Sequence, residues 1–179
     1  MGTTGVEFDH IINVQEKEWL YSTYETLKIA PLSNDLRVEL AKTLVEAEAL
    51  DLYLHKKWNN FKRYSGEGAE STIVALDQLF RLSSEAGYEN VVFGMPHRGR
   101  FNLLINILKY NARNLFRKVS GKTDTPIDLR NILDDVTSHI SHSITKTYGS
   151  KTLDVSMVHN PSHLEAQNPV SMGKTRSKI

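Results

Sequence analysis

The sequence predicts an α/β fold with a helical N-terminal region. Two observations support this prediction: only helical periodicity occurs in the first 60 residues, and short apolar runs alternate with helix-forming stretches from residue 69 onward. We therefore expect a helical region over residues 1–64 and the opening part of an α/β domain over residues 65–179. Because only two strands are predicted, the parallel sheet of this domain is expected to be incomplete.

Three helices are predicted in the first half of the chain. Residues 14–30 and 35–60 have apolar side chains at three- and four-residue spacing, and a third helix over 69–86 ends before Gly87. We expect the apolar stripe of the second helix to pack in the core. The stripe of the first helix is Trp19, Leu20, Tyr24 and Leu27, and that of the second is Val38, Ala41, Val45, Ala49 and Leu52.

The second half contains shorter elements. A buried strand is predicted over residues 91–93 and a second one over 153–158. Helices are predicted over 98–109 and 112–118. Between them and the second strand lies a polar stretch, 119–135, whose glycine, proline, threonine and aspartate residues are typical of a loop.

Composition excludes several classes of protein. Hydrophobic residues make up 40% and charged residues 24% of the 179, as in ordinary soluble globular domains. The net charge of +1 and the short basic stretch at 174–178, without interleaved aromatic residues, argue against nucleic-acid binding. The absence of cysteine excludes disulfides and thiolate ligands, and Pro161 interrupts the one His-x-x-x-His pair, so no zinc site is expected.

The most informative segment is residues 91–102, Val-Val-Phe-Gly-Met-Pro-His-Arg-Gly-Arg-Phe-Asn. An apolar strand ends at Gly94, a proline turn follows, and the next stretch is helix-forming. Arg98 and Arg100 bring positive charge to the start of that helix, where anions are favoured, and His97 titrates near neutrality. The segment predicts a site for a phosphate- or carboxylate-bearing ligand, with a solvated basic turn as the alternative.

The same order of elements recurs near the C-terminus. Residues 160–169 read Asn-Pro-Ser-His-Leu-Glu-Ala-Gln-Asn-Pro and follow the predicted strand 153–158. Together with Gly-Met-Pro-His-Arg-Gly-Arg, this second motif resembles the thiamine-diphosphate-dependent first component of the 2-oxoglutarate dehydrogenase family. The N-terminal residues Phe8-Asp9-His10-Ile11 and Lys62-Arg63-Tyr64 also fit that family. The resemblance therefore covers most of the chain and implies a transketolase-like, thiamine-diphosphate-binding domain.

The resemblance implies roles for individual residues. Arg98 is expected to contact the diphosphate, because a guanidinium can bind two phosphate oxygens at once. The histidines His97, His139 and His163 are expected to transfer protons. Substrate-binding residues are expected to be His97, Ser138 and Arg100. From the residues alone, Arg98 could instead form a structural ion pair, Arg100 could hold its loop through a carboxylate such as Glu67, and each histidine could be structural.

Ser138 also bears on the branch of the family. The motifs look most like those of the 2-oxoadipate dehydrogenases, whereas 2-oxoglutarate enzymes usually carry an aromatic residue just before the histidine that matches His139. A smaller side chain at this position would leave room for a diacid one methylene longer. Because one methylene is worth about 1–3 kcal/mol, overlapping specificity for 2-oxoadipate and 2-oxoglutarate is expected.

The family is several times longer than this chain, so we interpret the chain as a fragment of such an enzyme, inactive when isolated. The Mg²⁺ ligands of the family are expected downstream of Ile179. The full-length parent is expected to be a homodimer that passes its acyl group to a lipoyl-carrying acyltransferase, in the mitochondrial matrix of a eukaryote or the cytoplasm of a bacterium. The alternative is a non-catalytic module that serves assembly only.

Overall fold

The computed structural model describes residues 5–122, 136–159 and 163–179, and the chain divides into two compact units, residues 1–39 and 40–179. Within the first unit, helix α1 (Val14–Ile29) begins where the Asn13 side chain accepts a hydrogen bond from the amide of Glu16 at 3.1 Å. No residue of α1 is buried. The helix predicted over residues 14–30 is confirmed, and its residues Trp19 and Leu27 are exposed.

Helix α2 (Asn34–Lys57) is where predicted, but the face that it buries is different. Its buried residues are Ala47, Asp51 and Leu54. The predicted stripe is exposed instead, with Val45 64% and Leu52 57% accessible to solvent. The buried face includes the carboxylate of Asp51. A search for regularly spaced apolar residues therefore selected the exposed face of α2 instead of the buried one.

The sheet has three strands in the order β1-β3-β2. Strand β1 (Asn90–Phe93) pairs in parallel with β3 (Lys151–Met157), in register from Asn90 with Asp154 to Phe93 with Met157. Strand β2 (His142–Tyr148) was not predicted and pairs with β3 in antiparallel orientation. The α/β prediction is thus confirmed, and the parallel pair is present, but the sheet of the described residues is mixed.

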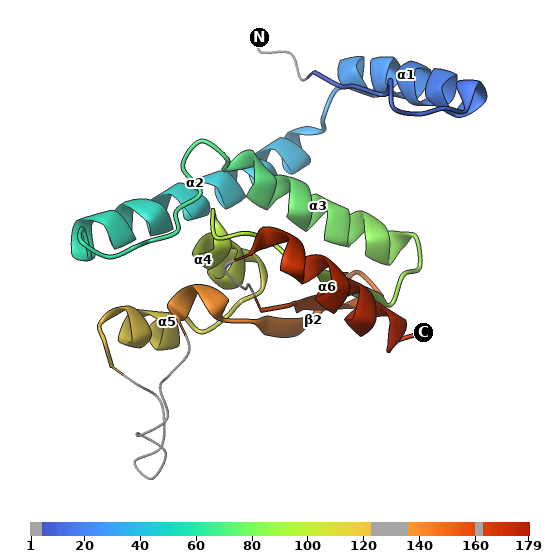
Figure 1. Cartoon of the computed structure of the whole chain (residues 1–179). Helices are drawn as coiled ribbons and strands as arrows, with labels where there is room; N and C mark the ends of the chain where they lie inside the picture. Colours follow the sequence, from blue (N-terminus) through green and yellow to red (C-terminus); the bar gives the residue numbers. More distant parts are fainter. Residues whose placement is uncertain (1–4, 123–135, 160–162) are drawn as a thin grey trace. The chain divides into compact units, whose positions relative to one another are not determined.

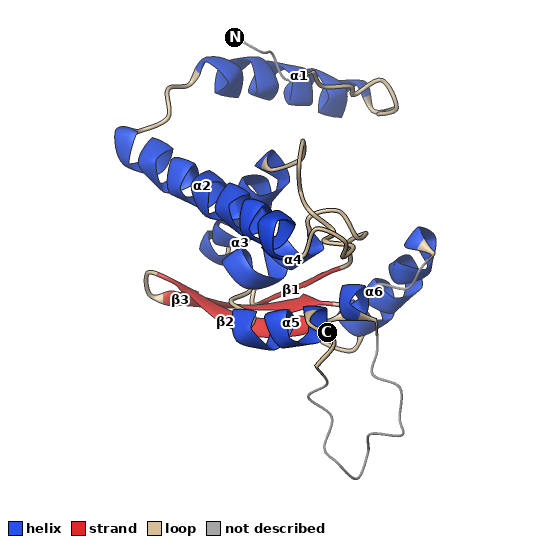
Figure 2. Cartoon of the chain, turned by 90° about the vertical axis from the view of Figure 1, so that its left-hand side faces the viewer, coloured by secondary structure: helices blue, strands red, loops and turns tan. Residues whose placement is uncertain are grey.

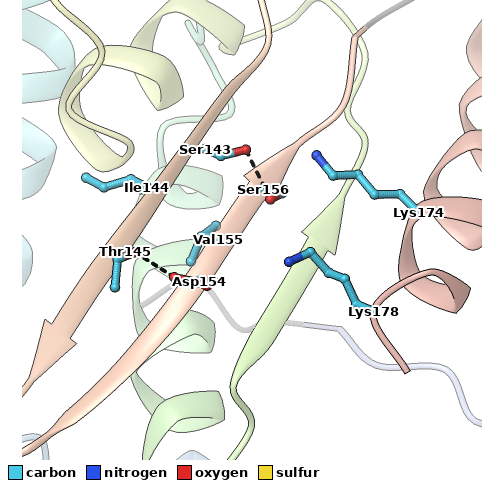
Figure 3. Close-up of a pocket in the computed structure, with 8 residues that line it drawn as sticks. All are labelled: Ser143, Ile144, Thr145, Asp154, Val155, Ser156, Lys174 and Lys178. Atoms are coloured by element: carbon cyan, nitrogen blue, oxygen red, sulfur yellow. Dashed lines mark hydrogen bonds between the residues drawn. The ribbon is translucent and has the colours of Figure 1, made fainter.

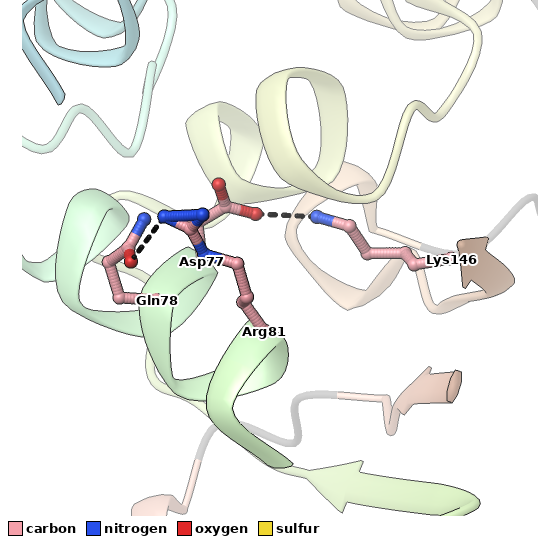
Figure 4. Close-up of polar contacts among 4 residues, drawn as sticks. All are labelled: Asp77, Gln78, Arg81 and Lys146. Atoms are coloured by element: carbon pink, nitrogen blue, oxygen red, sulfur yellow. Dashed lines mark hydrogen bonds and ion pairs between the residues drawn. The ribbon is translucent and has the colours of Figure 1, made fainter. Parts of the chain in front are cut away.

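Helix α3 (Ser71–Glu85) packs on the apolar face of the sheet. Figure 2 shows α3 and the short helix α4 (Arg100–Asn102) on the same side of the strands. Here the core gathers Phe80 of α3 with Leu153, Val155 and Met157 of β3. An ion pair joins α3 to β2, with Lys146 Nζ 2.5 Å from Asp77 Oδ1 (Figure 4). Beside this pair on α3, Arg81 donates a hydrogen bond to Gln78.

The segment after α4 is not the α-helix that was predicted over 98–109. It continues as one π-helical turn, Leu103–Ile107, in which the Leu108 amide donates to the Leu103 carbonyl at 3.0 Å. Helix α5 (Ala112–Val119) follows, close to its predicted bounds. The predicted loop 119–135 falls mostly outside the described residues. Helix α6 (Gln167–Arg176) ends the described structure (Figure 1).

Candidate active site

The two motif loops leave the sheet at one edge. Because β1 and β3 are parallel, their carboxyl ends at Phe93 and Met157 lie side by side. The Val158 amide donates to the Phe93 carbonyl at 3.0 Å and extends this pairing by one residue. Open α/β sheets bind ligands beyond the carboxyl ends of their strands. The structure therefore brings together the starts of the two motifs, which lie more than 60 residues apart in the sequence.

A turn that precedes α3 holds the His97 loop. The Gly99 amide donates to the carbonyls of Tyr64 and Ser65 at 2.9 and 3.1 Å. The Tyr64 ring lies 5.1 Å from the His97 ring, between centroids. Gly99 has a φ of 73°, which a residue with a Cβ rarely adopts, so glycine is favoured in the middle of the His-Arg-Gly-Arg run.

His97 is partly buried, and its Nε2 atom is enclosed without a hydrogen-bond partner among the described residues. Burial lowers the pKa of His97, and positive charge at His139, Arg100 and Lys62 lowers it further. The imidazole is therefore neutral at neutral pH and able to accept a proton.

Arg98 is exposed at the rim of a small cavity. One guanidinium nitrogen donates to the Glu67 carbonyl, and the charge of Arg98 lies near enough to the Glu70 carboxylate to contribute to lowering the pKa of Glu70. The cavity, about 220 Å³, lies between the His97 loop and the start of α3. Apolar side chains line most of it, among them Ile73, Leu76 and Leu103. A guanidinium at the mouth of an apolar cavity suits a ligand with a ring and an anionic group.

Arg100 has a different environment. It is fully buried, and its guanidinium donates to the carbonyls of Met95 (3.2 Å), Ile140 (2.8 Å) and Val158 (2.7 Å). Burial lowers its pKa to about 10, so it remains a cation at neutral pH. Arg100 thus joins three loops at the strand ends. The alternative bond to the Glu67 carboxylate does not form: the side-chain bonds of Arg100 in the described residues go to these three carbonyls.

Ser138 and His139 lie on a single 3-10 turn, Thr137–His139, next to the strand ends. Ser138 is only 2% exposed, and His139 is partly buried. The charge of His139 lies near enough to His97 to lower the pKa of His97. His159 links this turn to the second motif. Its Nδ1 lies 2.8 Å from the His139 carbonyl oxygen, and its Nε2 lies 3.1 Å from Ser141 Oγ.

The second motif is described in part. Residues 160–162 fall outside the described residues, and His163 is exposed at the start of the turn that leads into α6. No contact of the His163 side chain connects it to His97 among the described residues. Gln167 connects the second motif to the loop that carries His97 instead. It is 5% exposed, and its Nε2 donates to the Met95 carbonyl at 2.8 Å. Its position directly after Leu-Glu-Ala was the only sequence signal for this role.

A buried carboxylate lies behind the site. Asp51 of α2 accepts a hydrogen bond from the Gly66 amide at 2.9 Å, and this bond anchors the turn that carries Glu67. Burial raises the pKa of Asp51, and the nearby carboxylates of Glu67 and Glu70 raise it further, against the lowering effect of its hydrogen bonds to Gly66 and Asn102. Sequence reasoning missed Asp51, because it lies outside the apolar stripe predicted for this helix.

These positions define what the site can do. A neutral imidazole lies beside an exposed guanidinium, and a buried guanidinium fixes the loops around them. Such a set can bind an anionic group and move a proton. Among the described residues, no three histidine, aspartate or glutamate side chains gather to hold a metal ion, and no helix there is long and apolar enough to cross a membrane.

The sequence is similar to proteins of two dehydrogenase complexes. A probable 2-oxoadipate dehydrogenase complex component E1 homolog of Dictyostelium discoideum is 42% identical over 96% of this chain. The 2-oxoadipate dehydrogenase complex component E1 of Xenopus laevis is 39% identical over 99% of the chain. The 2-oxoglutarate dehydrogenase E1 component of Rickettsia felis is 38% identical, also over 99% of the chain.

The chain spans only 18–19% of the length of these relatives. No family model matches it. The relatives nevertheless confirm the resemblance that the two motifs indicated, and they include both of its branches. Over nearly its whole length, the chain is homologous to one part of the E1 components of 2-oxoadipate and 2-oxoglutarate dehydrogenases.

Proposed function

We propose that this chain carries part of the active site of a 2-oxo acid dehydrogenase that decarboxylates 2-oxoadipate, 2-oxoglutarate or both. The observation that supports this most is the exposed guanidinium of Arg98 beside the neutral imidazole of His97, at the shared carboxyl ends of two parallel strands. Substrate and cofactor of such an enzyme are both anionic, so they would meet complementary charge at this edge.

Thiamine diphosphate would supply the electron sink for decarboxylation, which no amino-acid side chain provides. Arg98 fits a role in binding its diphosphate, because the side chain is exposed and is already oriented by the Glu67 carbonyl. One such contact contributes about 1.5–3 kcal/mol. Millimolar affinity needs about 4.1 kcal/mol. We therefore expect the isolated chain to bind the cofactor more weakly than that, and Mg²⁺ ligands to come from other parts of the enzyme.

His97 and His139 are proposed to transfer protons and to hold a carboxylate of the substrate. Their partial burial and mutual proximity keep His97 neutral, so it can act as a base, while protonation creates a cation next to the bound acid. His163 is proposed for the same chemistry from the second loop. Arg100 is proposed to position both loops, since its enclosed guanidinium has no exposed surface for direct contact with a substrate.

The remaining parts of the proposal follow from the family. The parent enzyme would contain a transketolase-like domain, form a homodimer, and transfer its acyl group to a lipoyl-carrying acyltransferase. In a eukaryote this chemistry would take place in the mitochondrial matrix, and in a bacterium in the cytoplasm. A non-catalytic module is the second candidate, favoured by the exposed apolar face of α2 at Val45 and Leu52.

A chimera tests the proposal. This segment replaces its counterpart in the Xenopus laevis E1 component, and Arg98→Ala is compared with Arg113→Ala, which removes an exposed arginine on α5. We expect Arg98→Ala to raise the apparent constant for thiamine diphosphate by about 10- to 150-fold, which corresponds to the loss of one charge-assisted hydrogen bond. An unchanged constant in Arg98→Ala, or equal losses in both variants, would contradict the assignment.

A further inference from the structure

The face of the sheet opposite α3 carries a second, polar pocket. On β2 and β3 the side chains on this face are hydroxyls and one carboxylate, because they alternate with the core residues. Ser143 donates to Ser156 Oγ at 3.1 Å, and Thr145 donates to Asp154 Oδ1 at 2.6 Å. These four residues line one side of a hollow of about 350 Å³ (Figure 3).

Two lysines of the α6 segment line the other side. Lys174 and Lys178 are four residues apart, and Figure 3 shows both ammonium groups directed toward the strands. Lys178 Nζ donates to Asn90 Oδ1 at 2.6 Å, which fixes its position. Lys174 is half-buried, and its ammonium has no hydrogen bond or ion pair with the residues that the structure describes.

The donors of this pocket are arranged for an anion. Ser156 is 5% exposed, and because its oxygen accepts from Ser143, its own hydroxyl hydrogen is free to donate. Lys174 adds a cation with three donors, and Lys178 a second cation. Asp154 offsets only one of these charges and lies at the other end of the pocket, against Thr145.

We propose that this pocket binds a phosphate monoester. The phosphate would accept hydrogen bonds from Lys174 and Ser156, and a hydroxyl of the same ligand would donate to the Asp154 carboxylate. The volume of the pocket is at the lower end of the range for small-molecule sites, about 300–1,000 Å³. This site is separate from the strand-end loops, so it does not rest on the proposed function.

Calorimetric titration of the whole 179-residue chain tests the proposal, with inorganic phosphate as the first probe and constant ionic strength set with chloride. We expect saturable binding of one phosphate per chain. Lys174→Gln should weaken it at least ten-fold, and Ser156→Ala several-fold. Lys56→Gln is the matched control, because it removes the same charge from an exposed position on α2 and should leave binding unchanged.

Glycerol 3-phosphate is the second probe. It should bind more tightly than inorganic phosphate. Asp154→Asn should reduce this difference in affinity without weakening the binding of inorganic phosphate. Circular dichroism confirms that each variant is folded. If Lys174→Gln does not fold, Ser156→Ala is the variant that tests the proposal. Absence of saturable binding, or equal weakening by Lys174→Gln and Lys56→Gln, would overturn the proposal.

Discussion

Replacement of Arg100 by methionine tests whether this arginine positions the loops or contacts substrate. Methionine fills much of the same volume but removes the three hydrogen bonds to Met95, Ile140 and Val158. Each bond from a charged donor contributes about 1.5–3 kcal/mol. Relief of the desolvated charge offsets part of this sum, so we expect a net loss of about 3 kcal/mol in the free energy of unfolding.

Urea unfolding followed by tryptophan fluorescence measures this loss. With a slope of about 2 kcal/mol per molar urea, the midpoint should fall by about 1.5 M. Arg113→Met is the control, since this exposed arginine should change stability by no more than about 0.5 kcal/mol. If Arg100→Met is as stable as the native chain, the guanidinium does not hold the loops together.

Three further predictions concern buried groups. Burial raises the pKa of Asp51 above 3.8 in the folded chain, so the free energy of unfolding falls as the pH rises through this raised pKa. Asp51→Asn keeps an acceptor for the Gly66 amide and should flatten the pH dependence of urea unfolding above pH 4. Lys146→Met breaks the ion pair with Asp77 and should lower the free energy of unfolding by about 1.5–3 kcal/mol, whereas an unchanged urea midpoint would show that the pair contributes nothing. Ser138→Tyr overfills an enclosed position and should cost about 1–3 kcal/mol. In the chimera it should also lower the kcat/KM ratio of 2-oxoadipate to 2-oxoglutarate about ten-fold, and equal losses for both substrates would exclude Ser138 as a size filter.

The sequence predicted the strand and the turn before His97 well because their signals are local. A strand, a proline turn and a basic helix start lie within about a dozen residues around His97, and the parallel pairing of β1 with β3 follows once both strands are recognised. The roles of Arg98 and Arg100 could not be separated in this way. Both are arginines of one turn, and only the three-dimensional positions of Ile140 and Val158 bury one of them.

Strand β2 was missed although its sequence contains a signal. Residues 142–148 read His-Ser-Ile-Thr-Lys-Thr-Tyr, and every second side chain is partly buried in the structure. The two-residue loop that follows begins with Gly149, which has a φ of 61°, as a tight hairpin requires. The buried face of α2 had no such signal, because Asp51 pairs with the amide of Gly66, 15 residues away. Spacing within one helix cannot reveal a polar partner that tertiary contacts supply.

The His97 loop and the His139 turn meet at the strand ends. NMR titration of the histidine side chains in the 179-residue chain tests it most directly. The structure predicts that His97 titrates below its ordinary value of 6.5, and that His139→Gln raises the pKa of His97 by removing a neighbouring positive charge. A His97 pKa at or above 6.5 that His139→Gln does not change would contradict the account.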